Sequence, residues 1–417
     1  MRILIISNYY PPVELGGWEQ LTCNVAGQLR ERGHQVYVLT SNYRKGELVE
    51  DGDSPSRVLH LESPDPVRYH PHYSLLRAVW ERQNEAAVTT AVRDFKPDIL
   101  FVNGMWNLPY SVARRAEALL PGRVVYYLAS YWPTEQDAHT AYWQDVNRSG
   151  WRGVPKRILS ALVQRTLVPG EPRNRLDFTR VLCVSGFLRE YAVSQAGIPR
   201  ERTRVVHNGI ELDLFQAREG RQSPGTLRLL YAGRLSPDKG VHTVIESLAL
   251  LAKNYPDLQP RLSIYGGGPA DYEGRLKESV RKAGLNSRVS FCGLIPREEM
   301  PSAFAEHDVL VFPSIWSEPL ARIVQEAMAS GLVVVGTCTG GTGEILKDGE
   351  NGLVFESENP GMLAEKIRIL AGNPALQALL AAAARSTVEQ HFSLERMVDE
   401  IEANFQEILS EVERAFG

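Results

Sequence analysis

Cysteine, net charge and long apolar runs are all scarce in this sequence of 417 residues. The four cysteines are scattered and form no Cys-x-x-Cys pair; they are Cys23, Cys183, Cys292 and Cys338. This spacing argues against a disulfide framework or a zinc site, and it favours reduced thiols in a cytoplasmic compartment. The formal net charge of -4 argues against general nucleic-acid binding, so we expect no nucleic-acid partner.

No apolar run approaches the length of a membrane span. The N-terminus, "MRILIISNYYPP", has only a short apolar run before Ser7, too short for the core of a signal peptide and typical of a first strand. We therefore expect a cytoplasmic protein. Its hydrophobic content of 43% and charged content of 23% are typical of globular chains, and its length predicts two domains.

Short apolar runs alternate with segments of helical periodicity along the chain. The expected strands are "RILIIS", "QVYVLT", "DILFV", "RVVYYLA" and "RVLCVS" in the first half, and "LRLLYAG", "RLSIYG", "RVSFCG", "DVLVF" and "LVVVGT" in the second. This alternation predicts an α/β protein with two doubly wound parallel sheets. The polar segment 211–226 is the expected linker between domains at 1–210 and 227–392, and a helical run at 393–417 closes the chain.

Charged residues and glycines follow the expected strands of the second half. Arg234 stands at the end of one strand, and Lys239 follows at a helix start. The triplet Gly266–Gly268 forms the next loop, where backbone can approach a flat or phosphorylated ligand closely. Glu318 follows another strand, so we expect it at the same sheet edge as Arg234 and Lys239. Two cations beside a helix N-terminus suit a diphosphate, and because no Asp/Glu cage accompanies them we expect no metal.

The stretch "PSIWSEPLARIVQEAMASG" places two glutamates around a helix start. Its pattern predicts a helix that begins at Pro319 and ends at Gly331. Glu326 lies four residues after Arg322, so these two side chains could instead form an ordinary surface pair. Spacing alone leaves both interpretations open.

Together these motifs resemble glycosyltransferase family 4. The resemblance rests on "AGRLSPDKG", "YGGGP", "FCGLIPREEM", "PSIWSEPLARIVQEAMASGLVVVGT", "GGTGEIL" and "GENGLVF" in the second half, and on "ISNYYPPVELGGWEQ" and "VVHNGIEL" in the first. It implies a GT-B fold, which consists of two Rossmann-like domains. The first domain would bind the acceptor, and the second would bind a nucleotide-sugar donor. The closing helix at 393–417 would brace the first domain.

The resemblance implies a role for each matching side chain of the second half. Arg234 and Lys239 would hold the donor diphosphate. Glu326 would hold the ribose hydroxyls, and Glu318 those of the transferred sugar. Arg234, Lys239 and Glu318 are therefore the expected catalytic residues.

Backbone is expected to supply the other donor contacts. These contacts would involve Gly16 and Gly17 of the first domain and Gly268 of the glycine triplet. Backbone near Ile295 would face the nucleotide base of the donor, and backbone at Leu320 and Ala321 would face its phosphate.

The first domain departs from the family's pattern at one point. Many relatives carry His-Asp after the strand that "RVVYYLA" matches, but this chain has Ala129 and Ser130 there. Ser130, Glu135 and His139 are the candidate replacements on the acceptor side, and the sequence does not rank them. The family's usual Glu-Pro-Phe-Gly also ends in Ala321 here.

The function that the resemblance implies is metal-independent, retaining transfer of a sugar, of the hexosyltransferase type, from a nucleoside-diphosphate sugar to a hydroxyl. The acceptor would be a saccharide, a lipid-linked saccharide or a small molecule, in glycan, glycolipid or glycoside biosynthesis, and no cofactor is needed. Two alternatives stay open: a non-catalytic GT-B homologue that binds nucleotide sugar, and a sugar-nucleotide epimerase.

The segment 147–175 combines several arginines and lysines with an apolar stripe. It could touch an anionic membrane, which would place the protein peripherally at the inner membrane face. The other interpretation is a partly exposed helix packed on the first domain.

Overall fold

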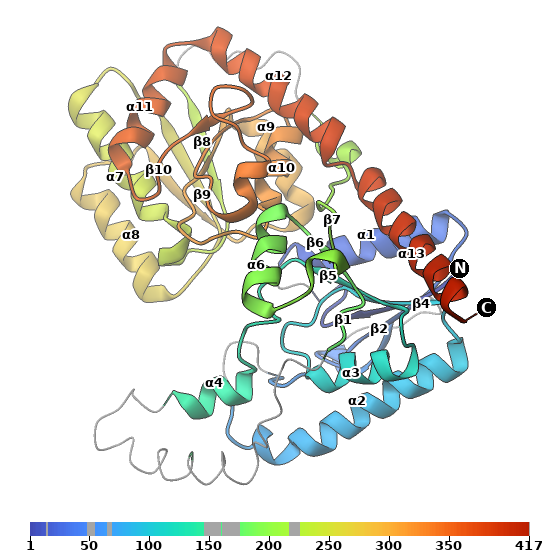
Figure 1. The fold of residues 1–417 in the computed structure, drawn as a ribbon. Helices are drawn as coiled ribbons and strands as arrows, with labels where there is room; N and C mark the ends of the chain where they lie inside the picture. Colours follow the sequence, from blue (N-terminus) through green and yellow to red (C-terminus); the bar gives the residue numbers. More distant parts are fainter. Residues whose placement is uncertain are drawn as a thin grey trace. The chain divides into compact units, whose positions relative to one another are not determined.

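The structure, a computed structural model, describes residues 1–13, 16–47, 55–64, 69–145, 160, 176–216 and 226–416. The chain forms two compact units. The N-terminal unit comprises Met1–Val184, Leu188–Val206 and Val398–Gly417, and the C-terminal unit comprises Ser185–Phe187 and His207–Met397. In each unit helices cover both faces of a sheet (Figure 1).

The N-terminal unit contains a seven-stranded sheet in the order β3-β2-β1-β4-β5-β6-β7. Its strands are β1 (Arg2–Ser7), β2 (Gln35–Ser41), β3 (Ser56–Leu59), β4 (Ile99–Val102), β5 (Val124–Leu128), β6 (Arg180–Cys183) and β7 (Thr203–Val205). All neighbouring strands are parallel. Strand order reverses between β1 and β4, which is the position where open α/β sheets form a ligand crevice.

The N-terminal unit also contains helices, several of which pack on its sheet. They are α1 (Trp18–Glu31), α2 (Tyr73–Phe95), α3 (Tyr110–Leu119), α4 (Ala138–Gln144), α6 (Gly186–Ala196) and the greater part of α13 (Leu394–Phe416). On α13, Phe405 is fully buried and its ring lies 5.2 Å from that of Phe101 in β4. Arg180 of β6 is buried and pairs with Glu407 and Glu411 at 2.9 Å each, so the sheet and this helix are tied by charge as well as by apolar contact.

The C-terminal unit contains a six-stranded parallel sheet in the order β10-β9-β8-β11-β12-β13. Its strands are β8 (Arg228–Ala232), β9 (Arg261–Tyr265), β10 (Val289–Gly293), β11 (Val309–Phe312), β12 (Val333–Gly336) and β13 (Leu353–Val354). Its helices are α7 (Val241–Asn254), α8 (Ala270–Lys282), α9 (Met300–Glu306), α10 (Arg322–Ala329), α11 (Pro360–Ala371) and α12 (Pro374–His391). Here the order reverses between β8 and β11, which makes the carboxyl ends of these two strands the expected ligand edge.

The doubly wound α/β class expected from the sequence is confirmed, and the ten expected strands are present. Three short strands were not expected: β3, β7 and β13, of four, three and two residues. Each lies at an edge of its sheet, where pairing with the neighbouring strand defines it.

The predicted start of the helix after β11 is wrong. The helix was expected to begin at Pro319, but α10 begins at Arg322. The reason is that the carbonyls of Glu318 and Pro319 are used elsewhere: they accept hydrogen bonds from the Gly341 N–H at 2.7 Å and from the Ser185 hydroxyl at 2.6 Å. The predicted end is confirmed, because Gly331 follows the helix with a φ of 73°.

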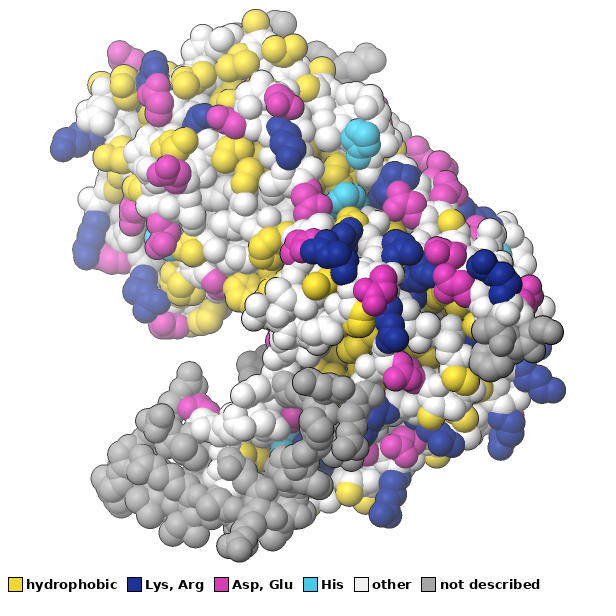
Figure 2. Space-filling model, viewed as in Figure 1, with side chains coloured by type: hydrophobic (Ala, Val, Ile, Leu, Met, Phe, Trp, Pro, Cys, Tyr) yellow, Lys and Arg dark blue, Asp and Glu magenta, His cyan; other side chains and the backbone are white. Residues whose placement is uncertain are grey.

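Charged side chains of both signs are interspersed over the drawn face of each unit, consistent with the small net charge (Figure 2). No single helix within the described ranges has the length and apolar composition needed to cross a bilayer, although α11 and α12, bent by 105° at their junction, reach that threshold as a pair.

Candidate active site

Two oppositely charged side chains meet at the carboxyl edge of the C-terminal sheet. Lys239 lies in the loop after β8 and Glu318 in the loop after β11, and they form an ion pair. Ser314 donates a second hydrogen bond to Glu318, at 3.0 Å. Because β8 and β11 flank the point where strand order reverses, the pair stands at the predicted ligand edge.

Glycines allow these two loops to approach each other. Gly240, next to Lys239, has a φ of 69°, and a Cβ built there would lie 2.0 Å from the carbonyl oxygen of Pro313. Gly340, in the loop after β12, has a φ of 61°, and its Cβ would lie 2.2 Å from the carbonyl oxygen of Glu318, so it brings a third loop against the loop after β11. Only glycine fits either position, since both conformation and space exclude a side chain. The sequence thus specifies the close packing that brings Lys239 to Glu318.

Arg234 lies at the start of the same loop, just after β8, and its side chain is exposed. The Tyr231 hydroxyl donates to its carbonyl oxygen at 2.7 Å, which fixes the backbone there. Within the described parts of the chain, no acidic side chain pairs with its guanidinium. Arg234 is therefore a cation available to a ligand.

Glu326 on α10 is 5% exposed and accepts hydrogen bonds from two arginines. Arg322 donates from Nε at 2.9 Å and Arg297 from Nη2 at 3.1 Å. Burial lowers the pKa of Arg322. The (i, i+4) pair with Arg322 therefore exists, but the interpretation as an ordinary surface pair is wrong, because a second arginine and burial make it a compact charged cluster.

Four of the backbone positions expected to contact a donor follow strands at this edge of the C-terminal sheet. Gly268 is packed so closely that a Cβ would lie 1.9 Å from the carbonyl oxygen of Leu235. Ile295 is half-buried in the loop after β10, and Leu320 and Ala321 are buried just before α10. Gly16 and Gly17 belong to the N-terminal unit, where the Gly16 N–H donates to Glu19 and Gly17 caps α1.

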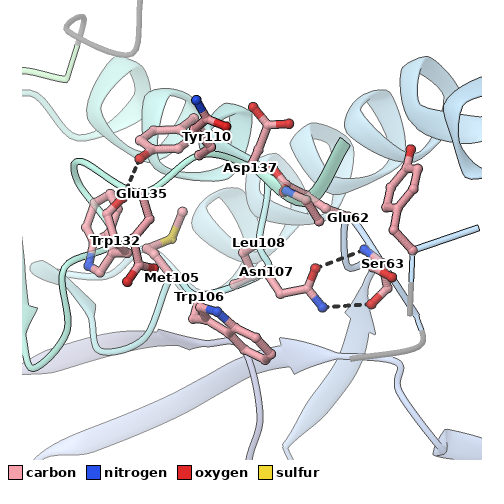
Figure 3. A pocket seen from close by; sticks show the side chains of 13 residues that line it. Glu62, Ser63, Met105, Trp106, Asn107, Leu108, Tyr110, Trp132, Glu135 and Asp137 are labelled. Atoms are coloured by element: carbon pink, nitrogen blue, oxygen red, sulfur yellow. Dashed lines mark hydrogen bonds between the residues drawn. The ribbon is translucent and has the colours of Figure 1, made fainter. Parts of the chain in front are cut away.

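The N-terminal unit contains a pocket of about 240 Å³ that the sequence did not predict as a whole. Loops after β3, β4 and β5 form it, and its lining comprises Glu62, Ser63, Tyr69, Met105, Trp106, Asn107, Leu108, Tyr110, Trp132, Glu135, Gln136, Asp137 and Ala138 (Figure 3). Of the candidate acceptor-side residues, Glu135 lines this pocket, whereas Ser130 and His139 do not. Trp106 was missed, although its place just after β4 is a signal that sequence reasoning could have used.

His139 lies one layer behind this pocket. Its Nδ1 is 2.8 Å from the hydroxyl of Tyr69 and 3.1 Å from that of Ser74, and the indole of Trp143 donates to Ser74 at 2.9 Å. Burial lowers the pKa of His139 to about 4, so the ring is neutral near pH 7. It positions Tyr69, which lines the pocket, and is not exposed to a ligand itself.

The segment 147–175, for which a membrane contact was one interpretation, lies outside the described residues except for Ser160. That hypothesis therefore stays a prediction.

Two parallel α/β units, one with a charged cluster where its strand order reverses, define the two-domain class of the GT-B glycosyltransferases. Within that class the chain belongs to glycosyltransferase family 4. The family model "Glycosyltransferase Family 4" matches residues 15–214, and "Glycosyl transferases group 1" matches residues 215–387. The family expected from the sequence is confirmed.

Relatives support this assignment over different lengths. YtcC of Bacillus subtilis (strain 168) is 30% identical over 258 residues, which are 58% of this chain and 63% of YtcC. The chain thus matches less than two thirds of that protein. The glycogen synthase of Mycobacterium tuberculosis (strain CDC 1551 / Oshkosh) is 25% identical over 409 residues, which are 94% of this chain and 91% of that protein.

Among solved structures, HepE from Anabaena is similar with a TM-score of 0.69 at 22% identity, covering 98% of this chain and 100% of that one. At this identity the likeness shows the fold, and it confirms the GT-B architecture expected from the sequence.

Proposed function

We propose that this protein is a metal-independent, retaining glycosyltransferase that uses a nucleoside-diphosphate sugar and a hydroxyl acceptor. The observation that carries the proposal is the meeting of Lys239 and Glu318 where the strand order of the C-terminal sheet reverses. Solved structures of HepE contain UDP and UDP-glucose, and a donor of this class at the same sheet edge would explain both charges.

Lys239 can bind the nucleotide sugar and keep its ion pair with Glu318 at the same time. An ammonium group has three donors, and Glu318 uses one of them, so a phosphate oxygen can take another. Glu318, held by Lys239 and Ser314, would accept hydroxyls of the transferred sugar. In this way the ion pair fixes both side chains before the donor arrives, which reduces the ordering cost of binding.

Glu326 would bind the ribose. An ionised carboxylate offers about four acceptor positions, and Arg322 and Arg297 occupy two of them. Acceptor positions remain for a ribose hydroxyl, and hydrogen bonds to a carboxylate are stronger than those between neutral groups.

The reaction would proceed at the anomeric carbon of the donor sugar. The bond to the diphosphate breaks, and the acceptor oxygen forms its bond on the same face, which retains the configuration. The acceptor proton passes to an oxygen of the departing diphosphate. Arg234 and Lys239 would stabilise the negative charge that grows on this diphosphate, which lowers the barrier as well as binding the donor.

One observation supports a second candidate, a protein that binds nucleotide sugar without turning it over. Ala129 and Ser130 follow β5, at the position where many relatives have His-Asp. Release of free nucleoside diphosphate in the presence of any acceptor would exclude this candidate. Isomerised donor without nucleotide release would instead indicate an epimerase.

The donor site is tested by thermal unfolding with UDP, GDP, ADP, dTDP and their sugar conjugates, in buffer without added metal. A ligand that binds only the folded state raises Tm with its saturation, so one base should give a clear shift. That shift should disappear in Arg234→Ala and persist in Arg281→Ala, a control on the exposed face of α8. No shift with any nucleotide would contradict the proposal.

A further inference from the structure

The pocket in the N-terminal unit lies at the carboxyl edge of its sheet. Glu62 and Ser63 follow β3, the segment from Met105 to Tyr110 follows β4, and Trp132 to Ala138 follow β5. Three adjacent loops therefore form it. Its volume of about 240 Å³ is below the roughly 300–1,000 Å³ of pockets for drug-sized ligands, which favours a single ring as occupant.

Aromatic side chains give this pocket flat apolar walls. Trp106 is 43% exposed, so much of its indole is available to a ligand. Trp132 is buried, and the Tyr110 hydroxyl donates to its carbonyl oxygen at 2.7 Å, which holds these two loops together. Figure 3 shows Trp132 and Met105 on one side, Glu62 and Ser63 on the other, and Trp106 between them.

The floor beside Trp106 is rigid because of its neighbour Asn107. The Asn107 side chain donates to the Ser63 carbonyl at 2.7 Å and accepts from the Ser63 N–H at 2.9 Å (Figure 3). Its own carbonyl accepts from the Glu62 N–H at 2.9 Å. Asn107 has a φ of 62°, a conformation that Asn adopts more readily than most residues. The loops after β3 and β4 are thus joined before any ligand binds, and Trp106 is held in place.

Carboxylates and an amide supply hydrogen-bond acceptors next to these rings. Glu62 accepts from the Ala138 N–H at 3.0 Å, and this contact fixes its carboxylate at the pocket. Glu135 and Gln136 also line the pocket. No lysine or arginine is among its described lining residues.

We propose that this pocket binds a saccharide ring of the acceptor, with the apolar face of the ring on Trp106 and its hydroxyls donating to Glu62 and Glu135. A sugar ring complements both parts of the pocket. Its apolar C–H face can pack on an indole, and the hydroxyls around its edge can donate to carboxylates. An alkyl or aryl alcohol would use only the apolar wall. The inference rests on the proposed function, because it takes the occupant of this site to be the acceptor.

Saturation-transfer NMR on the full-length chain tests the pocket without a donor. The probes are the methyl glycosides of glucose, galactose, mannose and N-acetylglucosamine, with cyclohexanol and benzyl alcohol as apolar controls of similar size. We expect at least one glycoside to give a signal about fivefold or more above both alcohols. Alcohols that match the glycosides, or no glycoside signal at millimolar concentration, would overturn the proposal.

Variants assign the signal to this pocket. Trp106→Ala should reduce it about fivefold or more, and Trp106→Phe should restore part of it, because a smaller ring still offers a flat face. Tyr255→Ala is the control, an equally exposed aromatic in the C-terminal unit at 44%. Glu135→Gln should weaken the signal, whereas Glu201→Gln, on an exposed turn, should not. An unchanged signal in folded Trp106→Ala would contradict the assignment.

The two proposals can fail separately. A nucleotide shift in Tm without glycoside binding would leave the transferase and remove the saccharide pocket. Glycoside binding at Trp106 without any nucleotide shift would leave a sugar-binding site in a protein that is not the proposed transferase.

Discussion

Arg234 is the residue on which the proposed chemistry depends most directly. Its guanidinium is exposed at the edge where Lys239 and Glu318 meet. We expect Arg234→Ala to lower kcat/KM roughly 30- to 1,000-fold, about 2–4 kcal/mol, because a charged contact to the leaving diphosphate is lost in the transition state. Steady-state kinetics with the identified donor measures this, beside Arg281→Ala. A loss below threefold would contradict the role.

Glu326 should affect donor binding more than turnover. Glu326→Gln keeps the volume but removes the charge that orients Arg322 and Arg297. We expect the donor KM to rise about tenfold, the effect of one hydrogen bond to a charged group, with a smaller change in kcat. Since the variant also leaves two arginines without a carboxylate, its Tm should fall, and kinetics must be measured well below it. An unchanged KM would indicate a purely structural cluster.

His139 predicts a pH dependence of stability. Burial lowers its pKa in the folded protein to about 4, below the ordinary value of 6.5. The unfolded chain therefore binds a proton in this range that the folded protein does not, so the free energy of unfolding falls as pH drops from about 6.5 to about 4. Chemical denaturation at several pH values should show this slope, and His139→Asn should flatten it. His60 and His307, whose pKa values burial also lowers, would account for the slope that remains.

At the scale of elements, the close approach of the loops after β8 and β11 requires glycine at position 240. Gly240→Ala combines a positive φ with a contact of 2.0 Å to backbone, so we expect a loss of at least about 2 kcal/mol in the free energy of unfolding. Gly274→Ala is the matched control: it lies inside α8 with nothing within 4 Å of its Cβ position, and it should stabilise by about 0.5–1 kcal/mol. Equal effects of the two substitutions would contradict this account.

Long elements were predictable because each carries its own pattern. The runs that form β1, β8 and β11 are buried along almost their whole length, and the 23-residue α2 and α13 carry helical patterns throughout. The start of α10 was not predictable, because the Glu318 and Pro319 carbonyls find partners from distant segments. A local pattern cannot show such tertiary competition.

The candidate site was predictable to a similar extent. Motif spacing placed Lys239 and Glu318 at one edge, but it did not show that they pair, nor that Arg297 joins Arg322 on Glu326. The pocket around Trp106 was missed because three separate loops build it and none has a distinctive spacing.

At the scale of the molecule, α13 should determine whether the N-terminal unit is stable. Removing residues 398–417 would expose Phe101 and leave buried Arg180 without Glu407 and Glu411. We expect the N-terminal strands to lose protection in hydrogen–deuterium exchange while β8 and β11 keep theirs. Phe405→Ala, a milder change, should cost about 3–5 kcal/mol in the same unit. Equal protection of both units in the truncated protein would contradict this.

The membership of α13 in the N-terminal unit has a consequence for synthesis on the ribosome. The first 206 residues emerge early, yet the helix that completes their unit emerges only after about 190 further residues. At a synthesis rate of roughly 5–20 residues per second, the apolar surface around Phe101 stays uncovered for roughly 10–40 s. The C-terminal unit, made from one nearly continuous segment, can fold first, so the usual order of domain folding along a chain would be reversed.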